Sequence, residues 1–152
     1  MLEIEGNLWD LPADAYVITT NGTVKKNGEA VMGRGVALQA AQRWKSLPRR
    51  LGALIKDQGN RVSEIHMHRE DESPYYIVFF PVKHNWWEKA DKKLIEKSTE
   101  QLVKLAAQKG WEVVALVRPG CGNGQLKWED IRPLLADRLD DRFVVVEVSN
   151  AA

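Results

Sequence analysis

Short apolar or alternating segments, typical of strands, follow one another along the chain with longer amphipathic segments, typical of helices. Apolar and acidic residues alternate over residues 2–5, which predicts a strand with one exposed side. The β-rich run at residues 15–19 is typical of a buried strand, and residues 6–14 are expected to form a loop. A glycine-punctuated stretch from Asn21 to Gly35 then leads into an amphipathic helix, so the pattern here is strand, long loop and helix.

The rest of the chain continues this alternation. A second, short helix is expected to begin near Pro48, because proline suits a first turn, and to close at Gly59. The remaining expected elements are strands at residues 62–68, 75–82, 113–117 and 143–148 and helices at residues 90–109 and 128–139. About six strands and four helices in this order predict an α/β fold with a mixed sheet that is covered on both faces.

Composition and charge narrow the class of protein. The chain has 152 residues with 22 Lys+Arg against 21 Asp+Glu, which predicts one globular domain, 1–152, without a general attraction to nucleic acid. Cys121 is the only cysteine, which excludes an intrachain disulfide and a multi-cysteine zinc site. No apolar run approaches 18 residues, and acids stand where a signal peptide would be basic. We therefore expect a soluble, cytoplasmic monomer with no membrane partner, metal ion or cofactor.

Two glycine-rich segments are candidates for anion binding. Gly33 and Gly35 precede a helix and would let backbone amides approach a phosphate, although a purely structural turn is the alternative. Residues 119–124 hold three glycines after an apolar strand, which favours an anion-binding nest of backbone amides. Neither segment matches GxxxxGK[ST] or GxGxxG, which argues against a mononucleotide kinase or a standard dehydrogenase. Together the segments predict a diphosphate held mainly by backbone amides.

Several motifs, spread over nearly the whole chain, resemble the macrodomain family. They are Ile-Thr-Thr-Asn-Gly at residues 18–22, Val-Met-Gly-Arg-Gly-Val-Ala at 31–37, Phe-Pro-Val-Lys-His-Asn-Trp at 80–86, and Pro-Gly-Cys-Gly at 119–122 followed by Leu-Lys-Trp at 126–128. The run around Lys83 is most similar to the branch that contains the terminal ADP-ribose protein glycohydrolase and an antitoxin macrodomain that removes ADP-ribose from thymidine in DNA. This resemblance implies a three-layer α/β/α fold with a mixed, mostly parallel six-stranded sheet.

The resemblance also implies a ligand and an activity. Macrodomains bind ADP-ribose, so the expected function is binding of ADP-ribose and hydrolysis of an ADP-ribosyl linkage on DNA, protein or a small metabolite. Two other functions stay open: a reader module that binds without cleaving, and a phosphatase acting on ADP-ribose 1″-phosphate. The implied ligand-binding residues are Asn7, Leu8, Asn27, Met32, Gly33, Arg34, Gly35, Val36, Pro119, Gly120, Cys121, Gly122, Asn123 and Gly124.

For catalysis the resemblance points to Lys83 and Asn21. In the related branch the matching lysine is catalytic, and in the terminal glycohydrolase it attacks the anomeric carbon of the distal ribose. That attack requires a neutral amine and hence desolvation or a nearby cation such as His84 or Arg34. Asn21 is expected to orient the ribose or water, with Asn27 as its rival.

Three departures and one open feature qualify the resemblance. Asn7 stands where macrodomains usually place the aspartate that accepts a hydrogen bond from adenine; it can accept that bond or merely turn the chain, and Asp10 is a second candidate. No aspartate stands between Asn27 and Gly35, where other macrodomain classes carry one. Gly124 replaces the aspartate that resolves the lysine adduct in protein-directed enzymes, which favours the DNA-directed relatives. Trp86 and the following Trp87 are either a hydrophobic lid or a stacking surface for a base or ribose.

Overall fold

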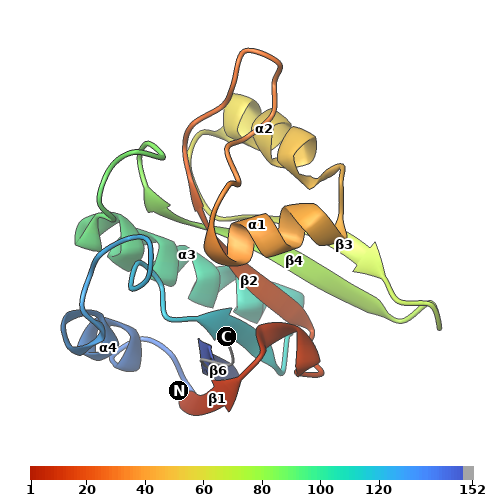
Figure 1. Cartoon of the computed structure of the whole chain (residues 1–152). Helices are drawn as coiled ribbons and strands as arrows, with labels where there is room; N and C mark the ends of the chain where they lie inside the picture. The colour runs from red at the N-terminus through yellow and green to blue at the C-terminus, as the bar shows by residue number, and fades with distance from the viewer. Residues whose placement is uncertain (149–152) are drawn as a thin grey trace.

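One six-stranded sheet organises the computed structural model, which describes residues 1–148. Residues 149–152, which the predicted domain also included, lie outside the described residues. The strands are β1 (Leu2–Gly6), β2 (Ala15–Asn21), β3 (Ser63–His68), β4 (Pro74–Lys83), β5 (Val114–Val117) and β6 (Phe143–Val148). Their order is β1-β6-β5-β2-β4-β3, and only β3 runs antiparallel to its neighbour (Figure 1). The predicted mixed, mostly parallel sheet is confirmed.

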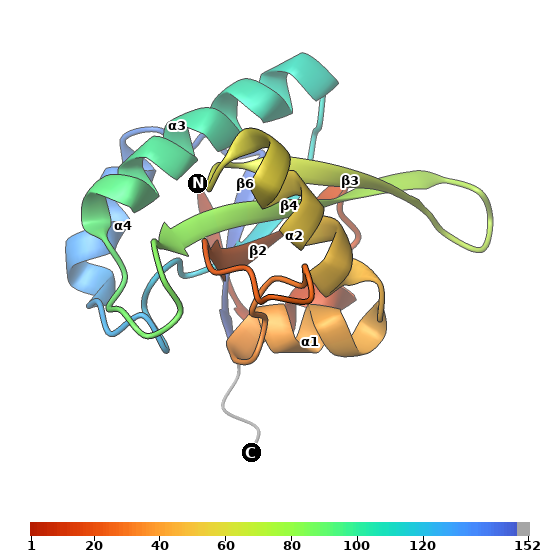
Figure 2. The same cartoon turned by 90° about the horizontal axis from the view of Figure 1, so that it is seen from above.

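Helices cover the two faces of the sheet and make three layers (Figure 2). The helices are α1 (Gly35–Arg43), α2 (Leu47–Gln58), α3 (Lys92–Lys109) and α4 (Trp128–Ala136), with a short 3₁₀ helix, η1, at Leu8–Asp10. Adjacent strand residues point to opposite faces. Val17 packs in the core under α3 and α4, whereas Ile18 packs in the core under α1 and α2. This alternation of fully buried side chains is why the central strands read as continuous apolar runs.

Local sequence determines both ends of α3 and the C-terminal end of α2. Asp91 accepts a hydrogen bond from the Lys93 amide and starts α3, two residues later than expected. Gly110 ends that helix in the left-handed conformation (φ 70°), as predicted, and Gly59 (φ 83°) ends α2. The segment 6–14, expected to be a loop, contains η1, because the Asn7 side chain caps it.

The edge strand β1 departs from its expected burial. Glu3 pairs with Arg132 of α4, so Leu2 and Ile4 point to the opposite face of the sheet. Both apolar side chains remain exposed, by 47% and 40%. A half-buried strand was therefore the wrong expectation, and alternation alone did not show that this edge is open on both sides. None of the helices within residues 1–148 has the length and apolarity that crossing a membrane would require.

Candidate functional site

A cavity of about 1100 Å³ lies at the carboxyl ends of the five parallel strands. Asn21, Lys83, Val117 and Val148 close β2, β4, β5 and β6, and all four line it. The first residues of α1 and α4 line it as well. Open α/β sheets bind ligands at this edge, because loops and helix N-termini converge there. The volume is about what small-molecule sites reach, roughly 300–1000 Å³.

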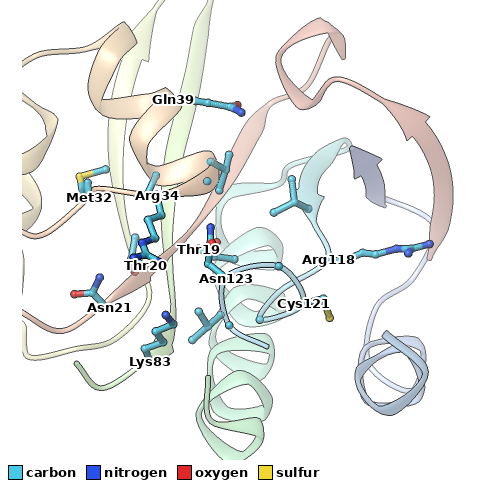
Figure 3. Close-up of a pocket in the computed structure, with 18 of the residues that line it drawn as sticks. Thr19, Thr20, Asn21, Met32, Arg34, Gln39, Lys83, Arg118, Cys121 and Asn123 are labelled. Carbon is cyan, nitrogen blue, oxygen red and sulfur yellow. The ribbon is translucent and has the colours of Figure 1, made fainter. Parts of the chain in front are cut away.

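The charge of the cavity lining differs from that of the chain. Lys25, Arg34, Lys83 and Arg118 line it, and no aspartate or glutamate does among residues 1–148. The whole chain is nearly neutral, with a formal net charge of +1. Arg34 and Lys83 lie at one end of the cavity, whereas the Arg118 side chain at the other end extends away from the second glycine loop (Figure 3) and lies 3.4 Å from Glu147 Oε1. Such a lining selects anionic ligands and offers no carboxylate for metal binding or proton transfer.

The first glycine loop brings backbone amides to the cavity. Gly35 has φ +55°, and a Cβ atom built on Gly33 would meet nothing within 4 Å. Arg34, at the N-cap of α1, makes no side-chain hydrogen bond to the first turn. The amides of that turn therefore stay available to an anion, which the helix dipole also attracts.

The second glycine loop is folded tightly on itself. Gly120 has φ +75°, and its Cβ would lie 2.7 Å from Ile95 Cδ1. A Cβ on Gly124 would lie 2.4 Å from the Gly120 carbonyl oxygen, so no side chain fits there without moving backbone. This loop conformation therefore excludes an aspartate at position 124. The two loops approach each other, since a Cβ on Gly35 would lie 3.3 Å from Asn123 Nδ2.

A β-bulge places Lys83 beside Asn21. Thr20 pairs with Pro81, but the next residue, Asn21, pairs with Lys83, so Val82 is the extra residue. Without the bulge Asn21 would pair with Val82, whose side chain points to the opposite face from that of Lys83. Lys83 Nζ donates to the Trp86 carbonyl at 3.4 Å. Figure 3 shows Asn21 and Lys83 at the same end of the cavity.

The Asn21 side chain holds the first loop in place. Its Oδ1 accepts a hydrogen bond from the Thr23 amide at 2.9 Å, and its Nδ2 donates to the Val31 carbonyl at 3.1 Å. Asn27, the rival, does not line the cavity; it is exposed and its side chain binds Glu29. Of the two asparagines, the structure brings only Asn21 to Lys83.

His84 does not lie in the cavity. Its Nε2 is 2.8 Å from Asp91 Oδ2, and its hydrogen bond lowers the pKa of the Asp91 carboxyl. Of the two cations expected near Lys83, only Arg34 lines the same cavity.

Asn7 and Leu8 line the cavity at the end of β1. Asn7 Oδ1 already accepts a hydrogen bond from the Trp9 amide at 3.0 Å as the cap of η1. The expected acceptor for adenine thus also turns the chain. Asp10, the second candidate, does not line the cavity.

Cys121 lies half-buried in the second loop, and its Sγ donates to the Pro119 carbonyl at 3.4 Å. Burial raises the pKa of its thiol to about 11, so the thiol is protonated at neutral pH. No group of three His, Cys, Asp or Glu side chains within residues 1–148 is placed to hold a metal ion. His66 instead stacks on Tyr76, with ring centroids 4.9 Å apart.

The cavity gathers most of the predicted site. The predicted residues that line it are Asn7, Leu8, Asn21, Met32, Gly33, Arg34, Gly35, Val36, Lys83, Gly120, Cys121, Gly122, Asn123 and Gly124, whereas Asn27 and Pro119 do not. Further lining residues were not predicted as ligand-binding: Thr19, Thr20 and Trp128, which lie within the quoted motifs, and Thr23, Lys25, Gln39 and Arg118, which lie outside them. Arg118 directly follows β5. It could have been predicted from the sequence, because residues just after the carboxyl ends of parallel strands line ligand sites in α/β folds.

Comparison with known sequences gives the same family for most of the chain. A family model described as "Macro domain" matches residues 23–135. The chain is 30% identical over 142 residues to the DNA ADP-ribosyl glycohydrolase of Thermus aquaticus, covering 90% of this chain and 37% of that protein. It is 26% identical over 132 residues to the DNA ADP-ribosyl glycohydrolase of Mycobacterium tuberculosis, covering 86% of this chain and 36% of that protein. The chain thus spans about a third of the length of these curated relatives.

Comparison with solved structures agrees. The macrodomain of Mycobacterium tuberculosis DarG has a TM-score of 0.80 and 25% identity, covering 96% of this chain and 98% of that one. The macrodomain of Thermus aquaticus DarG has a TM-score of 0.76 and 26% identity, covering 95% of both chains. Thermosipho africanus DarTG in complex with ADP-ribose has a TM-score of 0.77 at 19% identity, covering 92% of this chain and 39% of that one, and shows the fold alone.

Proposed function

The chain belongs to the macrodomain family, and we propose that it binds ADP-ribose in the cavity and hydrolyses an ADP-ribosyl linkage on DNA. The observation that carries the proposal is the pairing of Asn21 with Lys83 at the end of an acid-free, cationic cavity. The relatives in Thermus aquaticus and Mycobacterium tuberculosis are named DNA ADP-ribosyl glycohydrolase, which supports DNA as the carrier.

We assign each part of ADP-ribose to a region of the lining. The diphosphate lies between the two glycine loops, where the free amides at the start of α1 and the Arg34 side chain meet it. The adenine end lies toward Asn7 and Arg118, and the distal ribose lies toward Asn21 and Lys83. The linkage to be cut then projects past Lys83 to the mouth of the cavity.

The available side chains limit the chemistry. Most glycosidases hydrolyse their substrate with two carboxylates. That mechanism is excluded here, because no aspartate or glutamate within residues 1–148 lines the cavity. The protonated Cys121 thiol is a poor nucleophile. Lys83 is the remaining nucleophile of the lining, and we assign it that role, which requires the amine in its unprotonated form.

The steps follow from that assignment. The Lys83 nitrogen forms a bond to the anomeric carbon while the bond to the leaving atom of the base breaks. The nitrogen then loses one proton and the leaving atom takes one up, so the proton count is unchanged. Water then hydrolyses the lysine adduct, which restores the amine and releases ADP-ribose. Asn21 holds the loop that borders the distal ribose, through its bonds to Thr23 and Val31.

The test uses an ADP-ribosylated single-stranded oligonucleotide and an ADP-ribosylated protein. Lys83→Ala is expected to lower release of ADP-ribose at least about a hundredfold while ADP-ribose affinity, measured by calorimetry, changes less than about threefold. Lys26→Ala is the matched control, because Lys26 is exposed and does not line the cavity. Unchanged turnover in Lys83→Ala would exclude the mechanism.

A reader module is the second candidate, because Gly124 cannot carry the aspartate that completes the protein-directed reaction. A reader binds ADP-ribose but leaves both marked substrates intact. Release of phosphate from ADP-ribose 1″-phosphate identifies a phosphatase instead.

A further inference from the structure

The loop between β4 and α3 is held rigidly beside the mouth of the cavity. This loop, residues 84–91, is named the tryptophan loop below. The Gly22 amide donates to the His84 carbonyl at 3.1 Å, and the Trp86 amide donates to Thr23 Oγ1 at 3.1 Å. The His84–Asp91 contact at 2.8 Å closes the loop at its base. The loop is therefore ordered before any ligand arrives.

Two indole rings on this rigid loop face solvent. Trp86 is 48% exposed and lines the cavity, and Trp87 is 64% exposed and lies outside it. Their ring centroids are 5.9 Å apart with planes at 87°, so the two rings present faces in different directions. A lid would bury indole surface, whereas here the larger part of Trp87 stays open. Two adjacent exposed rings form a contiguous apolar patch, and such patches are used as binding surfaces.

The charges around the loop favour a polyanion. Lys25 and Lys83 line the cavity that Trp86 borders, and Lys83 Nζ contacts the Trp86 carbonyl. The loop itself adds the exposed Lys89, and Asp91 Oδ2 is held by His84 Nε2 at 2.8 Å. Glu88 accepts a hydrogen bond from the neutral Asn85 amide at 2.8 Å and keeps its charge. Aromatic faces flanked by lysines are the means by which proteins hold unpaired nucleotides, with bases stacked on the rings and phosphates beside the cations.

We propose that the tryptophan loop is a stacking surface for single-stranded nucleic acid, on which Trp87 takes a base adjacent to the ADP-ribosylated nucleotide. The proposal rests on the proposed function, because it places the modified base at Lys83 and the neighbouring base on Trp87. An unpaired strand is required, since bases within a duplex offer no free face. Preorganisation of the loop lowers the entropic cost of stacking.

The experiment compares two substrates that carry the same ADP-ribosylated base. One is a short single-stranded oligonucleotide and the other is the modified nucleoside alone. Trp87→Ala is expected to lower kcat/KM for the oligonucleotide about fivefold or more and to leave the nucleoside unchanged. Trp87→Phe keeps an aromatic face and is expected to retain most of the activity on the oligonucleotide. Ile4→Ala is the control, because it removes an exposed apolar side chain of the edge strand that does not line the cavity.

Equal losses on both substrates would overturn the proposal, because Trp87 would then only support the cavity. No loss on either substrate would overturn it as well, and so would a loss larger for ADP-ribosylated protein than for the oligonucleotide. If the wild-type protein releases no ADP-ribose from the oligonucleotide, the proposed hydrolase function is wrong, and the stacking surface needs a test without turnover.

That test is binding of a labelled, unmodified single-stranded oligonucleotide, measured by fluorescence anisotropy. Weaker binding by Trp87→Ala than by Ile4→Ala supports the stacking surface, and equal binding excludes it.

Discussion

The two glycine loops of the cavity use the same residue type for different purposes. In the first loop, a Cβ on Gly33 would meet nothing within 4 Å, so the missing side chain leaves space for a ligand. In the second loop, Gly124 is packed against the Gly120 backbone and Ala90, so the missing side chain lets the loop close on itself. Gly122, in the same loop, is open like Gly33. The glycine content of the sequence therefore identifies both loops, whereas only the packing around each glycine shows which of them leave space for a ligand.

Gly124→Ala tests the crowded second loop and is expected to have the largest effect on stability. The new Cβ would lie 2.4 Å from the Gly120 carbonyl oxygen, which forces backbone to move. We expect a loss of about 2 kcal/mol or more in the free energy of unfolding, measured by urea denaturation, together with weaker ADP-ribose binding. Gly122→Ala is the control and should change stability by less than about 0.5 kcal/mol. Equal stability of the two variants would remove the distinction between the glycines.

Gly33→Val tests the open loop, where the new side chain enters space that the structure leaves empty. Stability should stay within about 0.5 kcal/mol of wild type. ADP-ribose affinity should fall at least about tenfold by calorimetry, because the isopropyl group occludes the amides at the start of α1. Retained affinity with an unchanged fold would show that the diphosphate does not pass this loop.

Asp91→Ala tests the support behind the second loop, since the Ala90 amide donates to the Gly124 carbonyl at 3.0 Å. Losing the cap of α3 should cost about 1 kcal/mol at neutral pH. The pKa of Asp91 is lowered, chiefly because His84 donates a hydrogen bond to it, so its stabilisation is present above the unfolded-state pKa and is lost as pH falls through the folded one. The difference between variant and wild type should therefore shrink in acid. A difference independent of pH would show that the carboxylate charge contributes nothing.

Cys121→Ser is expected to have the smallest effect. The thiol packs within the second loop and is protonated at neutral pH, so ADP-ribose affinity and turnover should change less than about threefold. In wild type, alkylation by iodoacetamide should be slow at neutral pH and accelerate toward pH 11, because burial raises the pKa of the thiol to about 11. Rapid labelling at neutral pH would contradict that buried environment.

Much of the fold follows from local patterns that act over a few residues. Buried runs and caps such as Asp91 and Gly110 define elements because propensity and hydrogen bonding are local. The pattern did not show η1, nor the exposure of Leu2 and Ile4 on β1. Neither feature changes the hydrophobic periodicity of the sequence, because one depends on a single capping side chain and the other on the position of the strand at the edge of the sheet.

The sequence alone determined the alternation of strands and helices, the two glycine loops, and Lys83 in a motif that resembles a macrodomain. Tertiary structure decided the pairing of Lys83 with Asn21 through the bulge at Val82, the exclusion of Asn27 and His84 from the cavity, and the absence of acids from its lining within residues 1–148. The physical reason is the range of each interaction. Periodicity and capping depend on neighbours along the chain, whereas strand register, the orientation of loop side chains and the net charge of a cavity depend on segments that meet only after folding.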